Sequence, residues 1–175
     1  MSNQYTMKSR LLVEQSAFPA IKDHLNSFID TVSITDVTKD REYRKKDLDL
    51  LWTINIAPTP QTLSLEIKAD TYVSGNFFFE TASNAEKGTP GCFMYTEADF
   101  VFYYFLKTGE LYKLPMPATR QWFKENMNLF QERSTRTPCG GPLGHYTTIG
   151  RLVPIKTVME SNIGVEKSIL RANIQ

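Results

Sequence analysis

Cysteine and histidine are scarce in this sequence, which has two of each among its 175 residues. Cys92 and Cys139 form no Cys-x-x-Cys pair, and with two histidines they supply too few ligands for a structural zinc site. Neither a Walker phosphate-binding loop nor a Gly-x-Ser-x-Gly motif is present, which argues against an NTP-driven enzyme and a serine hydrolase. We therefore expect two reduced thiols without a role as an activated nucleophile.

Long hydrophobic runs and an excess of one charge are also absent. The longest apolar run covers only residues 100–106, whereas a membrane-spanning helix needs about 20 residues. The first residues lack the apolar core of a signal peptide. The net charge of +1 excludes a binder held by bulk charge but allows a local basic patch. We expect a soluble, cytoplasmic protein.

The composition is typical of a folded domain. Hydrophobic residues make up 41% and charged residues 22% of the chain, which excludes disordered and collagen-like architectures. No repeat or linker divides the chain. The expected fold class is α/β, with residues 1–175 as a single domain and a central mixed β-sheet flanked by helices.

Periodicity and turn residues assign the elements of this domain. Pro19 divides the first helical pattern, so residues 3–17 and 20–29 form either two helices or one. Further helices are expected at residues 97–106 and 118–129, with a weak helix at the C-terminus. Strands are expected at residues 31–37, 47–54, 63–70, 77–80, 110–114 and 151–155, and surface loops at 84–91 and 135–150.

The most informative pattern is the strict alternation of residues 63–70, Leu-Ser-Leu-Glu-Ile-Lys-Ala-Asp. Side chains of a strand alternate between its two faces, so Glu66 and Lys68 share the polar face. Asp47 and Asp49 share one face of the preceding strand by the same rule. If the two strands form an antiparallel hairpin, Asp49 reaches Glu66 across it. We expect these side chains in one solvent-facing cleft.

Two carboxylates beside a lysine suit metal-assisted cleavage of a phosphodiester bond. Carboxylate oxygens hold Mg²⁺, which lowers the pKa of a bound water, and the ammonium stabilises the developing negative charge. The alternative is a solvated strand face with a minor ion pair, because the pattern acid-x-Lys is common by chance.

These residues resemble the PD-(D/E)XK nuclease superfamily, whose fold is the restriction-endonuclease-like fold. The matching residues are Asp49 and the run Glu66-Ile67-Lys68, and the order helix, strand, Asp strand, Glu-x-Lys strand, helix, strand also fits. Residues 95–104 are similar to the helix entry of small phage-type and resolvase-like members. The resemblance covers about residues 10–115, and the glycine-rich loop and C-terminal elements occupy residues 130–175. Leu48 stands where the family often has proline.

The resemblance implies a role for each matching residue. Asp49 and Glu66 become metal ligands, the backbone carbonyl of Ile67 becomes a third ligand, and Lys68 becomes the catalytic lysine. Asp47 is the alternative to Asp49 as a ligand. Two more acids are candidates for the metal site, each with a solvated surface acid as the alternative interpretation: Glu80 and Glu14.

A basic run precedes the proposed metal ligand. Its last members, Arg44, Lys45 and Lys46, either contact phosphates beside the cleaved bond or belong to a solvated charged turn. The glycine-rich loop is a second candidate phosphate contact, through the backbone amides of Gly140 and Gly141.

The sequence thus predicts a metal-dependent deoxyribonuclease, with endonuclease activity favoured and Mg²⁺ as cofactor, for which Mn²⁺ can substitute. The expected partner is DNA and not a membrane. A homodimer is left open, because one site per chain cuts a single strand. The alternative function is a non-catalytic nucleic-acid-binding or interaction protein on the same fold.

Overall fold

The computed structural model describes residues 7–139 and 144–170, apart from the side chains of residues 7–12 and 14. Its helices are α1 (Met7–Asn26), α2 (Arg41–Lys45), α3 (Cys92–Tyr95), α4 (Ala118–Asn126) and α5 (Ile155–Glu160), with short 3-10 turns at Ala85–Lys87 and Met127–Leu129. Its strands are β1 (Thr31–Asp36), β2 (Leu50–Ile56), β3 (Thr59–Asp70), β4 (Asn76–Asn84), β5 (Thr89–Pro90), β6 (Phe100–Phe105), β7 (Glu110–Pro115), β8 (Gln131–Pro138), β9 (His145–Pro154) and β10 (Glu166–Ile169).

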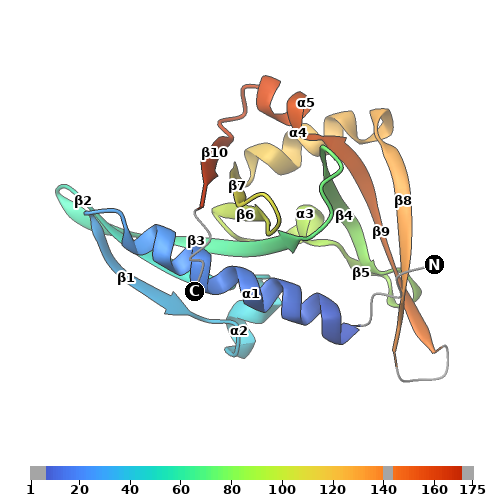
Figure 1. The fold of residues 1–175 in the computed structure, drawn as a ribbon, viewed down its shortest axis with the longest axis horizontal. Helices are drawn as coiled ribbons and strands as arrows, with labels where there is room; N and C mark the ends of the chain where they lie inside the picture. The colour runs from blue at the N-terminus through green and yellow to red at the C-terminus, as the bar shows by residue number, and fades with distance from the viewer. Residues whose placement is uncertain (1–6, 140–143, 171–175) are drawn as a thin grey trace.

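The strands form two sheets. A mixed six-stranded sheet has the order β1-β2-β3-β6-β7-β10, in which β3 and β6 are the parallel pair. An antiparallel four-stranded sheet has the order β5-β4-β9-β8. Figure 1 shows α1 along one side of the larger sheet and the smaller sheet with α3, α4 and α5 on the other. The expected single α/β domain with a mixed sheet is confirmed, whereas the second sheet and the small helical content were not expected.

Helix α1 covers one face of the large sheet and is continuous through Pro19. Ala17, Ile21 and Leu25 are completely buried and pack against β2, β3 and β6. These residues lie on both sides of Pro19, which itself is exposed. The burial of one apolar stripe across the proline therefore outweighs the backbone hydrogen bond that proline removes. The helix is one element rather than two.

Aromatic residues fill the space between the two sheets. Phe77 and Phe79 of β4 are completely buried among residues of β6, β7 and the helices α3 and α4. The ring of Phe77 meets that of Tyr103 edge to face with centroids 5.0 Å apart, and the Phe79 ring stacks on Phe93 at 3.9 Å. Such ring pairs add specific geometry to the burial of apolar area.

Residues 97–106, expected to be helical, instead contain the central strand β6. Val101, Tyr103 and Phe105 face the core beside the small sheet, while Phe102 and Tyr104 face the core beneath α1. A strand that is buried on both faces has a continuous apolar run instead of an alternating one. The prediction of a helix was wrong because the apolar run of residues 100–106 lacks the alternation of apolar and polar residues by which a strand is recognised.

The expected loop at residues 135–150 was also wrong where the structure describes it, because β8 and β9 form a long hairpin. A Cβ atom at Gly150 would lie 2.7 Å from the ring of Phe78, so this glycine permits close packing inside a strand. Gly140 and Gly141, considered as a phosphate contact, lie outside the described residues. The expected C-terminal helix corresponds to α5 and the strand β10.

No helix among the described residues is long and apolar enough to span a membrane.

Candidate functional site

The polar face of β3 forms the base of the site. Leu65 and Ile67 point into the core below α1, while Glu66 and Lys68 point toward the small sheet and α3, as their alternation predicts. The Nζ atom of Lys68 lies 2.6 Å from Oε1 of Glu66. The expected solvent-facing position is wrong for Glu66, which is only 4% exposed. The second sheet, which the sequence did not reveal, covers this face.

Asp49 lies opposite Glu66, immediately before β2. The expected hairpin of β2 and β3 forms with Leu50 paired to Leu65. The backbone N–H of Asp49 donates to Leu65, and its Oδ2 atom accepts the N–H of Ile67 at 2.9 Å. The charge of Asp49 helps to raise the pKa of Glu66, so the two carboxyl groups interact electrostatically.

The carbonyl of Ile67 lies on the same side of β3 as its N–H group. In an extended strand, the N–H and C=O groups of one residue point toward the same neighbouring strand. The Ile67 N–H points to the Asp49 carboxylate, so the Ile67 carbonyl faces that side too, beyond the start of β2. This position is compatible with the ligand role expected for it.

Asp47 reaches the site through the turn after α2 and not through a strand. Its φ of 60° is left-handed, a conformation that aspartate tolerates. The N–H of Asp47 donates to Arg44 and the N–H of Leu48 donates to Tyr43, which is the hydrogen-bond pattern of a Schellman helix end. The expectation that Asp47 and Asp49 share one face of a strand was therefore wrong, because β2 begins only at Leu50.

The segment after α3 holds Asp47 in place. The Tyr95 hydroxyl donates to Oδ1 of Asp47 at 3.1 Å, and the Thr96 hydroxyl donates to the backbone carbonyl of Asp47 at 2.9 Å. Arg120 of α4 fixes this segment in turn by donating to the carbonyls of Phe93 and Thr96. The Asp47 carboxylate is thus oriented by two layers of contacts.

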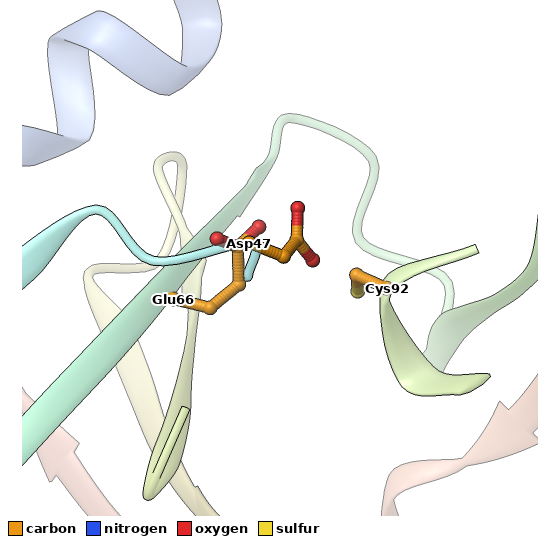
Figure 2. A group of neighbouring side chains, drawn as sticks. All are labelled: Asp47, Glu66 and Cys92. Atoms are coloured by element: carbon orange, nitrogen blue, oxygen red, sulfur yellow. The ribbon is translucent and has the colours of Figure 1, made fainter. Parts of the chain in front are cut away.

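Cys92, the first residue of α3, completes the cluster. Ligand atoms of Asp47, Glu66 and Cys92 all lie within 4.8 Å of one another, and Figure 2 shows the Asp47 carboxylate between the other two side chains. Gly91 makes this approach possible, because a Cβ atom there would lie 2.3 Å from the backbone of Glu80. A residue with a side chain at position 91 would displace α3 and with it Cys92.

Burial and mutual repulsion dominate the electrostatics of the cluster. Burial raises the pKa of Glu66 well above its usual range, and the charges of Asp49 and Asp47 raise it further, against the opposing effect of Lys68. Burial also raises the pKa of Asp49. Burial alone would lower the pKa of Lys68, but the charge of Glu66 and other nearby anions holds it above its usual value. Lys68 therefore stays protonated.

One carboxylate oxygen of the cluster lacks a hydrogen-bond donor among the described residues. Oδ2 of Asp47 is buried and accepts no hydrogen bond from the part of the chain that the structure describes. Leaving a buried carboxylate oxygen without a partner is costly. Three carboxyl groups share one lysine here, so a divalent cation would balance the charge and use the free oxygen. The residues present fit an oxygen-liganded metal ion.

The two further acids expected near the metal are placed differently. Glu80 of β4 acts electrostatically on Lys68 and lines a pocket beside it. Like Asp49, it does not belong to the Asp47, Glu66 and Cys92 group of possible ligands found among the described residues. Glu14 lies on α1, and its side chain is outside the described part.

The three basic residues before Asp47 are exposed on and after α2. Lys45 pairs with Glu42 at 2.7 Å and Lys46 with Glu97 at 3.2 Å. Arg44 forms no side-chain ion pair with any described residue, so it is the most available of the three for a phosphate.

Sequence reasoning missed Cys92 and Tyr95 as members of the site. Both precede β6, which was interpreted as a helix, and no local pattern connects them to residues 47–68. Only the parallel pairing of β3 and β6 brings the segment before β6 back to Asp47.

Comparison of the chain with protein-family models, with curated proteins and with solved structures finds no match.

Proposed function

We propose that this protein is a metal-dependent deoxyribonuclease that hydrolyses phosphodiester bonds, with endonuclease activity favoured. The observation that carries this proposal is the cluster of the buried Glu66 and the half-buried Asp47 and Asp49 beside Lys68. One buried carboxylate oxygen of this cluster accepts no hydrogen bond from any described residue. A purely structural ion pair needs one acid and one base. Metal-assisted cleavage of a phosphodiester bond instead requires several carboxylates that bind a metal ion and a cationic group beside them. The three acids and the lysine supply these groups.

Asp47, Asp49 and Glu66 would hold the metal ion, with the Ile67 carbonyl as a further oxygen ligand. Mg²⁺ is the expected ion and Mn²⁺ its substitute, because both bind carboxylate and carbonyl oxygens. The bound ion supplies an activated water and neutralises charge on the phosphate. Burial raises the pKa of the Cys92 thiol, so Cys92 lines the site as a neutral group rather than as a thiolate ligand.

The chain's own residues position the reacting groups. Lys68 is held by Glu66 and stays protonated, so it directs a fixed positive charge toward the phosphate and stabilises the charge that develops there. Tyr95 and Thr96 orient Asp47, as outer-shell residues orient metal ligands. Arg44, followed by Lys45 and Lys46, supplies contacts to the DNA backbone.

The topology supports the restriction-endonuclease-like fold proposed from the sequence. Helix α1 is followed by the antiparallel strands β1, β2 and β3, and after α3 the chain returns in β6 parallel to β3. Asp49 lies before the second of these strands and Glu66-Ile67-Lys68 in the third, as the resemblance implies. The helix expected at residues 97–106 is the strand β6 instead, and the four-residue helix α3 stands before it. The small sheet enters between β3 and β6 as an addition.

Incubation with a panel of supercoiled, linear, single-stranded and branched DNAs tests the proposal. We expect the wild-type protein to cleave at least one of them in Mg²⁺ and none in EDTA. A Glu66→Gln variant purified in parallel controls for contaminating nucleases and should be inactive. If no DNA is cleaved, or if the variant cleaves as fast as the wild type, the non-catalytic binding function replaces this proposal.

A further inference from the structure

A pocket of about 500 Å³ lies directly beside the site. It is lined by Lys68 and by Glu80, and it extends from the end of β3 to β4 and β8. Figure 1 shows the end of β3 pointing toward the small sheet, so this pocket lies where the two sheets meet. Because Lys68 also contacts Glu66 at 2.6 Å, the site and the pocket share a wall.

The lining of the pocket combines an apolar surface with polar edges. Phe78 and Leu152 line it, and Tyr72 at its rim is 71% exposed. Asn76 and Thr135 add polar groups. A planar heterocycle with hydrogen-bonding edges is the kind of ligand that such a lining takes, because aromatic side chains stack on bases of any sequence.

The charges around the pocket suit a phosphate at its two ends. Arg133 of β8 lines the pocket and is exposed, and it forms no side-chain hydrogen bond or ion pair with any described residue. Lys68 lies at the end next to the metal ligands. Two acids also line the pocket, Asp70 and Glu80. The Asp70 carboxylate already accepts the Tyr72 N–H at 2.7 Å and the Tyr103 hydroxyl at 3.2 Å, and the charge of Glu80 acts on Lys68.

The volume of the pocket determines whether a paired or an unpaired base can enter it. A volume of about 500 Å³ accommodates one nucleotide, whereas a base pair inside a stacked duplex is too large to enter. A base reaches such a pocket only when it is unpaired, and unpairing costs least where the strand is already single.

We propose that this pocket takes the base of one unpaired nucleotide next to the scissile phosphate, so that single-stranded or splayed DNA is the preferred substrate. This inference rests on the proposed nuclease function. Tyr72 stacks on the base, and Arg133 binds the phosphate on the far side of the nucleotide from Lys68.

Cleavage and binding of one sequence as a single strand, as a duplex and as a duplex with a central unpaired bubble test the inference. We expect kcat/KM to be at least tenfold higher for the single strand and the bubble than for the duplex. Tyr72→Ala and Arg133→Ala should each lower cleavage of the single strand about tenfold. Arg136→Ala is the matched control, because Arg136 is exposed on the same strand but does not line the pocket.

Equal cleavage of duplex and single strand, or equal effects of the Arg133 and Arg136 substitutions, would refute the proposal that the pocket binds an unpaired base. Neither result would contradict the nuclease function. Fluorescence anisotropy with labelled oligonucleotides in EDTA separates the two failures. A different result would be that no DNA is cleaved, that single strands bind more tightly than duplex, and that Tyr72→Ala abolishes this difference. That result would support base binding in the pocket and refute the nuclease function. If binding is also unselective, the pocket is refuted too.

Discussion

Replacing Lys68 with methionine should lower the rate of DNA cleavage by about 10²–10³, which is the loss observed when one group that stabilises transition-state charge is removed. Methionine keeps most of the length and the apolar stem of lysine and removes only the ammonium group. Excess Mn²⁺ should not restore the rate, because the proposed metal ligands Asp47, Asp49 and Glu66 are unchanged in this variant. Single-turnover cleavage of a labelled oligonucleotide measures the effect.

Lys113→Met is the matched control for this substitution. Lys113 lies on β7 of the same sheet and pairs with Glu166 at 3.1 Å, and its side chain is 26% exposed, against 21% for Lys68. We expect wild-type cleavage from this variant. Equal losses from the two lysine substitutions would assign the Lys68 effect to sheet stability and would contradict its catalytic role.

Replacing Phe79 with alanine should destabilise the protein by about 3–5 kcal/mol, the usual cost of removing a completely buried phenylalanine. Phe79 stacks on Phe93 of α3 at 3.9 Å and meets Phe123 of α4 edge to face at 5.1 Å. It therefore joins the small sheet to the segment that carries Cys92 and Tyr95. Denaturant unfolding gives the change in free energy.

Phe28→Ala provides the comparison for Phe79. The Phe28 side chain is 45% exposed and contacts only the rings of His24 and Trp52 among the described aromatic residues. Its removal should cost about 1 kcal/mol or less, as for most surface substitutions. Similar losses for both variants would mean that the aromatic layer between the sheets does not hold them together.

The local part of the site was readable from the sequence. Strict alternation placed Glu66 and Lys68 on one face of a strand, and the expected antiparallel hairpin placed Asp49 opposite Glu66. Both inferences depend only on strand geometry and on contacts between neighbouring elements, which a sequence encodes within about 20 residues.

The rest of the site depends on long-range packing. Asp47 enters through a helix end, Tyr95 through the pairing of β3 with β6, and the burial of Glu66 through the second sheet. The apolar run of β6 had no period of two, and the glycine-rich character of residues 135–150 concealed a hairpin. Such contacts join residues that are far apart in the chain, so no local sequence pattern predicts them.

Calorimetric titration of Mn²⁺ into the metal-free protein tests the central claim most directly, because it measures the metal site without DNA or turnover. We expect saturable binding of about one ion per chain. Asp47→Asn keeps the left-handed turn and the shape of the side chain, and it should weaken binding at least tenfold, since it changes a ligand rather than an outer-shell group. Glu97→Gln, an exposed acid paired with Lys46, should bind as the wild type does. The absence of saturable binding, or equal affinities of the wild type and Asp47→Asn, would contradict the account.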